Sequence, residues 1–296
     1  QKLRKCALMM AEGISLSHRE LLQERLKNIR TGISDFSFAN LYLFRHVHDY
    51  RIHRGEDVFI SGKTYEGIPY LMVTRPVKEM DPGLIREMVE EYGMMFPVPE
   101  EWLDFFPDSE YEHLYHESDS DYVFTVEKMS TYKGKKLHGK RNLLRQFLDQ
   151  YSYEKYPLTR ERTEDARRIL DKWQEGMADP PEKTDYAACR EALELYEELS
   201  LCGAIYYVEG EPAGFMLGEG IREDMFALHF AKGDKRFKGL YQFMYNSCAR
   251  VLPETIRYIN FEQDLGKREL RLAKSSYLPD LMIRKYRIYP RNRENR

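Results

Sequence analysis

Two apolar runs flank a turn in the stretch Gly203-Ala204-Ile205-Tyr206-Tyr207-Val208-Glu209-Gly210-Glu211-Pro212-Ala213-Gly214-Phe215-Met216-Leu217-Gly218. Short runs rich in β-branched and aromatic residues, separated by a glycine and a proline, are typical of a β-hairpin. A third run of the same kind occupies residues 225–231. The stretch therefore predicts three consecutive antiparallel strands in the second half of the chain.

Helical patterns lie on both sides of these predicted strands. Apolar stripes at helical spacing precede them at residues 166–173 and 188–199, and another follows from residue 237 to 252. The remaining patterns predict a strand at 256–261, a helix at 268–276 and a last strand at 281–289. The second half thus alternates helices with mainly antiparallel strands.

The first half has a similar mixed order. Residues 57–61 and 69–74 predict a hairpin, and Asp81-Pro82 predicts the start of a helix whose apolar stripe continues to Met95. Residues 102–115 are expected to form helix and turn, and residues 121–125 a strand. Both halves indicate an α+β fold. We expect two domains, residues 1–155 and 156–296.

Composition narrows the class of protein. The 296 residues are 42% apolar, which suffices for a core, and the net charge of −3 excludes a globally basic nucleic-acid binder while leaving local basic patches possible. The apolar runs are too short to cross a bilayer. The four cysteines (Cys6, Cys189, Cys202 and Cys248) lack metal-ligand spacing. We interpret them as free thiols and expect a cytoplasmic protein without a metal.

The order of predicted elements resembles the GNAT (N-acetyltransferase) fold, in which a glycine-bearing turn before a helix holds the pyrophosphate of acyl-CoA. Residues 236–241 match that family's Arg/Gln-x-x-Gly-x-Gly/Ala pattern at Arg236 and Gly239. Tyr241 stands where the family has a small residue and would crowd a pyrophosphate. The resemblance implies phosphate-binding roles for Arg236 and Gly239, and we expect Lys235 or Lys238 to add to a phosphate site.

A wider resemblance rests on three motifs, at residues 34–41, 134–142 and 260–266 together with 274–277. Their sequences, Ser-Asp-Phe-Ser-Phe-Ala-Asn-Leu, Gly-Lys-Lys-Leu-His-Gly-Lys-Arg-Asn and Asn-Phe-Glu-Gln-Asp-Leu-Gly with Lys-Ser-Ser-Tyr, resemble bacterial proteins grouped with the phosphatidylglycerol lysyltransferase C-terminal domain. That group is similar to the Fem peptidoglycan aminoacyltransferases, which use aminoacyl-tRNA instead of acyl-CoA. The resemblance implies tandem GNAT-like domains, each a mixed, mainly antiparallel sheet flanked by helices.

These resemblances imply an acyl or aminoacyl transferase. The donor would be acyl-CoA or aminoacyl-tRNA, no other cofactor is implied, and the acceptor would be an amine or hydroxyl of a small molecule, lipid or peptide. The alternative is a non-catalytic binding protein that keeps the GNAT-like scaffold and a charged cleft for an anion. The sequence leaves the donor, the acceptor and the oligomeric state open.

Candidate catalytic residues lie in and after the strand predicted at 256–261. Glu262 and Asp264 alternate along the chain, so their carboxylates would face the same side and could handle an amine proton, and Tyr277 could protonate a leaving group. Alternatively, the carboxylates only form ion pairs with the following helix. The expected substrate-binding residues are Asn260, Arg271, Lys274 and Ser276.

The densest basic segment is residues 133–145, with seven basic side chains: Lys133, Lys135, Lys136, His138, Lys140, Arg141 and Arg145. Clustered cations favour phosphate contact, to CoA, a tRNA backbone or a lipid headgroup, but a solvated helix face has the same pattern. We expect Lys140 and Arg141 to bind phosphate. His229, within a predicted strand, is interpreted as a structural histidine.

Overall fold

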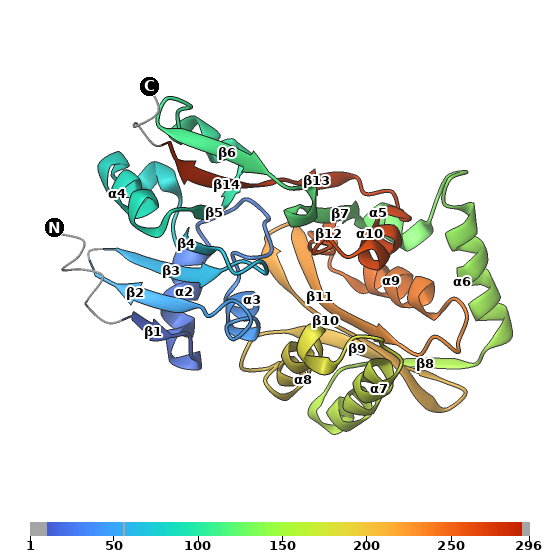
Figure 1. The fold of residues 1–296 in the computed structure, drawn as a ribbon. Coiled ribbons are helices and arrows are strands. Elements are labelled where there is room, and N and C mark those ends of the chain that lie inside the picture. Colours follow the sequence, from blue (N-terminus) through green and yellow to red (C-terminus); the bar gives the residue numbers. More distant parts are fainter. Residues whose placement is uncertain (1–10, 56, 292–296) are drawn as a thin grey trace. The chain divides into compact units, whose positions relative to one another are not determined.

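The computed structural model describes residues 11–55 and 57–291 and contains two seven-stranded sheets flanked by helices (Figure 1). By its contacts the chain divides into two compact units, each built from separate segments. Among the described residues, unit 1 comprises residues 11–55, 57–121, 263–266 and 282–291, and unit 2 comprises residues 122–262 and 267–281. The predicted boundary between residues 155 and 156 falls inside unit 2.

Unit 1 is built on a sheet with strand order β1-β2-β3-β4-β5-β14-β6. Its elements are β1 (Ala11–Gly13), α2 (Arg19–Leu26), α3 (Phe38–Leu43), β2 (Arg51–Arg54), β3 (Val58–Lys63), β4 (Pro69–Val73), α4 (Pro82–Tyr92), β5 (Met95–Pro99), β6 (Tyr111–Tyr115) and β14 (Lys285–Pro290). Strands β2, β3 and β4 are antiparallel, which confirms the predicted hairpin, and β4 and β5 are parallel.

Helix α4 shows how local sequence sets an element's ends. The Asp81 side chain accepts a hydrogen bond from the Leu84 amide at 2.9 Å, and Pro82 occupies the first turn. Gly93, with a left-handed φ of 76°, ends the helix. The prediction that the helix continues to Met95 is therefore wrong, and Met95 begins the buried strand β5.

The helix and turn predicted at residues 102–115 is only partly right. Residues Glu100–Phe105 form a 3-10 helix, but Tyr111–Tyr115 form strand β6. The partner of β6 is β14, with Tyr115 opposite Tyr286. Because this pairing joins residues more than 160 positions apart, the local pattern could not reveal it.

Unit 2 is built on a sheet with strand order β13-β7-β12-β11-β10-β9-β8. Its elements are β7 (Asp121–Thr125), α5 (Val126–Thr131), α6 (His138–Gln150), β8 (Tyr153–Pro157), α7 (Thr163–Glu175), α8 (Tyr186–Glu194), β9 (Cys202–Val208), β10 (Glu211–Arg222), β11 (Met225–Gly233), α9 (Leu240–Val251), β12 (Tyr258–Asn260), α10 (Arg268–Ser275) and β13 (Leu281–Ile283). Strands β9, β10 and β11 form the predicted antiparallel meander, and β12 lies parallel to β11.

The two sheets repeat one series of elements. Strands β2-β3-β4, helix α4 and the parallel strand β5 correspond in order to β9-β10-β11, α9 and β12. The next strand of each sheet comes from the other half of the sequence: β14 lies beside β5, and β7 lies beside β12. The boundary predicted between residues 155 and 156 lies within β8, and the compact units exchange one strand each.

A buried ion cluster holds β14 in unit 1. Lys285 is fully buried, and its ammonium contacts the carboxylates of Asp35 and Asp121, the latter at 2.6 Å, and the Gln263 side chain at 2.6 Å. Burial alone would lower the pKa of Lys285, but the two carboxylates outweigh burial and raise it. The last strand, β14, therefore supplies the cation that neutralises two carboxylates in the core of unit 1.

Within residues 11–55 and 57–291, no helix combines the length and apolar character required to span a bilayer.

Candidate functional site

Strands β11 and β12 separate at the centre of unit 2. They pair only from Met225–Tyr258 to Ala227–Asn260, after which β12 ends and β11 continues to Gly233. At the same level β11 has a bulge, because Leu217 pairs with Phe230 whereas Gly218 pairs with Leu228. The extra residue is His229. A bulge redirects a side chain, and bulges are frequent beside active sites.

His229 bridges two glutamates. Its Nδ1 lies 2.7 Å from Glu262 Oε1, its Nε2 lies 3.0 Å from Glu219 Oε1, and its side chain is fully buried. Burial would lower the pKa of His229, but the carboxylates of Glu262 and Glu219 outweigh burial and raise the pKa to about 10. At neutral pH the imidazole is therefore charged and donates to both carboxylates. The side chains of Glu219 and Glu262 are 14% and 16% exposed, respectively, whereas His229 is not exposed.

The segment after β12 adds two predicted site residues to this cluster. Asn260 Oδ1 accepts a hydrogen bond from the Glu262 amide at 2.6 Å, and Glu262 has a left-handed φ of 59°. Lys274 donates to the Glu262 carbonyl at 3.2 Å. The predicted alternation of Glu262 and Asp264 along a strand is wrong, because β12 ends at Asn260. Asp264 is a buried residue of unit 1 and accepts from the Gly266 amide at 2.8 Å.

A second group joins α6 to the end of α10. Lys140 Nζ lies 2.7 Å from Ser276 Oγ and 3.9 Å from the centroid of the Tyr277 ring. The Tyr277 hydroxyl is buried and accepts from Gln242 Nε2 at 2.8 Å. Burial lowers the pKa of Lys140 and raises that of Tyr277 well above its ordinary value. The Tyr277 phenol therefore keeps its proton to a higher pH than an ordinary tyrosine does.

Two other predicted site residues, Arg141 and Arg271, lie on α6 and α10. The Arg141 guanidinium donates to the carbonyls of Tyr132 and Gly134, at 2.5 and 2.8 Å, and so holds the segment before α6 against that helix. Arg271 is half-buried on α10. Phosphate binding by Arg141 remains a prediction, and its contacts give that side chain a structural role.

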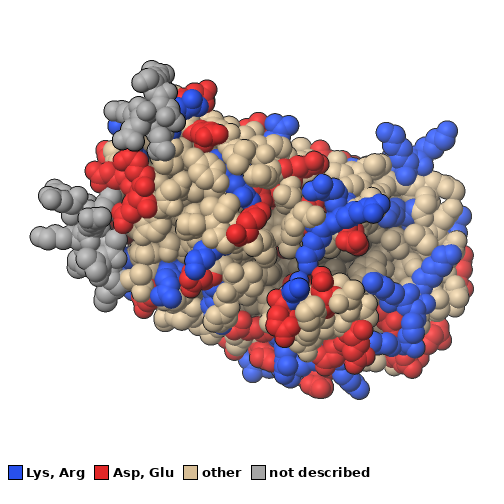
Figure 2. All heavy atoms as spheres, viewed as in Figure 1, with Lys and Arg blue, Asp and Glu red and all other residues tan. Residues whose placement is uncertain are grey.

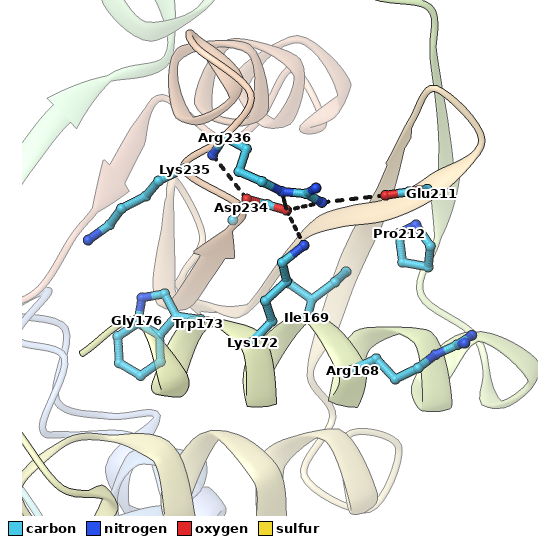
Figure 3. A pocket seen from close by; sticks show the side chains of 11 residues that line it. Arg168, Ile169, Lys172, Trp173, Gly176, Glu211, Pro212, Asp234, Lys235 and Arg236 are labelled. Carbon is cyan, nitrogen blue, oxygen red and sulfur yellow. Dashed lines mark hydrogen bonds and ion pairs between the residues drawn. The ribbon is translucent and has the colours of Figure 1, made fainter.

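A pocket of about 430 Å³ lies in unit 2 between α7, the start of β10 and the turn from β11 to α9 (Figure 3). Asp234 accepts from Lys172 at 2.7 Å and from Arg236 at 2.8 Å, and Arg236 lies 3.4 Å from Glu211. Burial would raise the pKa of Asp234, but the hydrogen bonds from Arg236 and Lys172 lower it to about 2. Arg236, a predicted phosphate ligand, is thus paired with the carboxylates of Asp234 and Glu211. The side chain of Lys235 extends away from Asp234 (Figure 3).

A buried cation beside this pocket escaped the sequence analysis. Lys232 donates to both carboxylate oxygens of Asp185, at 2.7 and 2.8 Å, and its ammonium lies 3.5 Å from the centroid of the Trp173 ring. Glu219 was missed as well. Lys232 is the one lysine, arginine or carboxylate of the mostly apolar strand β11, so a search for buried charges in apolar strands would have found it. Glu219 shares β10 with Glu211 and Arg222, so no such signal marks it.

Gly239, the predicted pyrophosphate glycine, is the N-cap of α9 and has a φ of 88°. A Cβ atom there would collide with the Leu143 carbonyl and lie 3.0 Å from Phe147 Cβ, so helix α6 fills the space beside it. Tyr241 closes the same turn, because its hydroxyl accepts from the Gly233 amide at 3.0 Å. Lys238 is exposed. The glycine is therefore required for packing and backbone conformation.

Over residues 26–289 the sequence matches the family described as phosphatidylglycerol lysyltransferase, C-terminal. The chain belongs to this family. The match spans both series of elements, and it confirms the resemblance of the three sequence motifs. The two mixed sheets have the predicted α+β fold of tandem GNAT-like domains.

Solved structures and one curated relative are similar to this chain. A conserved protein of unknown function from Bacteroides thetaiotaomicron VPI-5482 is 25% identical, with a TM-score of 0.82 over 96% of this chain and 100% of that chain. L-PGS from Bacillus licheniformis is 17% identical and shares the fold, with a TM-score of 0.62 over 93% of each chain. An uncharacterized protein of Mycoplasmoides gallisepticum is 26% identical over 181 residues, 59% of this chain and 58% of that relative.

Proposed function

We propose that the chain transfers an aminoacyl group from aminoacyl-tRNA to a hydroxyl of a lipid, and that the reaction takes place at Glu219, His229 and Glu262. Membership of the phosphatidylglycerol lysyltransferase C-terminal family supports a transferase with a lipid acceptor. The observation that carries the proposal is the pair of glutamates, held by one buried imidazolium, at the point where β11 and β12 separate.

The reaction is a transesterification. The acceptor hydroxyl oxygen attacks the carbonyl carbon of the aminoacyl ester, the bond from that carbon to the ribose oxygen breaks, and a new ester forms. The Glu262 carboxylate accepts the proton of the attacking hydroxyl, which then passes to the departing ribose oxygen. His229 is a positioning residue, because both of its N–H groups already donate to the glutamates.

Two features favour aminoacyl-tRNA over acyl-CoA as the donor. Carboxylates such as those of Glu219 and Glu262 can accept hydrogen bonds from the α-ammonium of an aminoacyl group, which an acetyl group lacks. In addition, α6 packs against Gly239, and Arg236 is paired with Asp234 and Glu211, so the turn where GNAT proteins hold a pyrophosphate is occupied by the protein's own groups.

The test measures transfer of a radiolabelled lysyl group from lysyl-tRNA to phosphatidylglycerol dispersed in detergent, with acetyl-CoA as the comparison donor. Glu262→Gln keeps the shape of the side chain but removes its ability to accept a proton. We expect it to lower kcat at least 100-fold, within the usual contribution of a general base, with a much smaller effect on KM. Glu254→Gln, an exposed glutamate of the same unit, is the matched control and should retain wild-type transfer.

Three results would contradict the proposal. Transfer from acetyl-CoA with none from lysyl-tRNA would assign the other donor class. Binding of tRNA or lipid without any transfer by the wild type would identify a non-catalytic binding protein. A Glu262→Gln protein with normal kcat per folded molecule would show that Glu262 has only a structural role.

A further inference from the structure

Among the described helices of unit 2 that have at least eight residues, α10 alone has no buried side chain. Of its eight residues, Arg271 and Lys274 are half-buried and the other six are exposed. Isolated helices of this length are marginal in water, and most helical stability in proteins comes from packing. With six exposed residues and none buried, α10 has little packing within the protein to stabilise it, and most of its surface is accessible to a partner.

Exposed leucines are concentrated on α10 and the segment that follows it. Leu270, Leu272, Leu278 and Leu281 are between 37% and 60% exposed, and they fall within twelve residues of one another. Leu272, the most exposed of the four, lies one helical turn from Arg268 and one turn from Ser276. A concentration of exposed apolar side chains marks a surface that contacts another phase or molecule.

The same segment of the chain is rich in cations. Residues 267–274 include Lys267, Arg268, Arg271 and Lys274, with Glu269 as the one acidic residue, and Asp179 lies 3.8 Å from Lys267. Asp280, further along, is paired with Lys128 at 2.7 Å. The segment thus combines a net positive charge with exposed leucines.

The basic segment singled out in the sequence continues this surface. Lys140 at the start of α6 contacts Ser276 at the end of α10, and Lys133, Lys135 and Lys136 just before α6 are exposed. Lys and Arg side chains gather over α10 and around α6 (Figure 2). We call these cations together with Leu270, Leu272, Leu278 and Leu281 the basic leucine surface.

We propose that the basic leucine surface docks unit 2 on an anionic lipid bilayer. A bilayer interface offers both a negative headgroup layer for the cations and an acyl boundary for the leucines. A polynucleotide offers phosphates but no apolar layer in which leucines are buried, so the leucines favour lipid over RNA. The inference deepens the proposed function and rests on it for the lipid acceptor, whereas docking itself requires no transfer.

Vesicle sedimentation tests the docking without a donor. The wild-type chain should bind phosphatidylcholine vesicles that contain phosphatidylglycerol more strongly than vesicles of phosphatidylcholine alone, and added salt should weaken the binding. Arg268→Gln should lower the partition coefficient about fivefold, and Leu272→Gln about tenfold. Val251→Gln is the matched control, because Val251 at the end of α9 is 62% exposed and lies outside the surface.

The proposal is overturned if binding does not depend on phosphatidylglycerol, or if Val251→Gln weakens it as much as Leu272→Gln. It is also overturned if Arg268→Gln weakens the binding of uncharged tRNA and leaves vesicle binding unchanged. Measuring aminoacyl transfer to detergent-dispersed lipid distinguishes the docking proposal from the proposed transferase function. A Leu272→Gln protein that loses vesicle binding but keeps this transfer supports both proposals. A wild type that transfers without binding vesicles disproves docking alone.

Discussion

At the scale of single residues, His229 is charged because of where the fold places it. Two carboxylates hold a fully buried imidazole that burial alone would keep neutral, and the pKa of His229 rises to about 10. A histidine whose pKa is raised on folding stabilises the protein fully below its unfolded pKa of about 6.5. That stabilisation is lost as the pH rises from about 6.5 toward 10.

This sign gives a prediction for the pH dependence of stability. The free energy of unfolding of the wild type should exceed that of His229→Gln by on the order of 4 kcal/mol at pH 6, and the difference should shrink steadily toward pH 10. Urea unfolding of both proteins at several pH values measures it. A difference that stays constant across this range would show that His229 stabilises unit 2 by packing alone.

At the scale of elements, the start of α9 depends on one glycine. Gly239 combines a φ of 88° with close approach to the Leu143 carbonyl of α6, so a side chain there meets both backbone strain and steric overlap. We expect Gly239→Ala to lower the free energy of unfolding by roughly 2–4 kcal/mol. Differential scanning calorimetry or urea unfolding tests this.

Gly139, on the neighbouring helix α6, provides the control. A Cβ atom at Gly139 would meet no atom within 4 Å, so Gly139→Ala should leave stability unchanged or raise it by up to about 1 kcal/mol. If both substitutions had the same small effect, the α6–α9 contact would not constrain position 239, and the glycine could serve a ligand instead.

At the scale of the whole molecule, the exchange of β7 and β14 makes each unit depend on a distant part of the sequence. Lys285, carried by β14, is the buried cation between Asp35 and Asp121. Replacing it by methionine leaves two carboxylates buried with one fewer partner, so Lys285→Met should destabilise unit 1 by about 3–5 kcal/mol. Arg284→Met, which removes an exposed pair with Glu100, should cost less than about 1 kcal/mol.

The two tryptophans allow each unit to be followed separately. Trp102 lies in unit 1 and Trp173 in unit 2, and the sequence contains no other tryptophan. In a Trp173→Phe background, fluorescence reports unit 1 and should show the loss caused by Lys285→Met. In a Trp102→Phe background it reports unit 2, where the midpoint should shift much less. Equal shifts in both backgrounds would mean that the units unfold together.

The sequence by itself determined the elements that local patterns specify. Apolar periodicity, turn residues and capping act over a few positions, and they were sufficient for three features. These are the meander at residues 202–233, the helix that starts at Asp81-Pro82 and the short helix after residue 267. Three motifs were enough to indicate the family and its fold. Glu262, which we propose as the general base, was singled out in the same way, because a carboxylate directly after a predicted strand is visible without a structure.

Only the tertiary structure decided which distant residues meet. Three sets of contacts join residues between 10 and 250 positions apart in the sequence. They are the pairing of β6 with β14, the contacts of Lys285, and the cluster of Glu219, His229 and Glu262. No local pattern encodes such contacts, because they depend on strand register, and a shift of one residue moves a side chain to the other face. The bulge at His229 changes that register and makes the cluster possible.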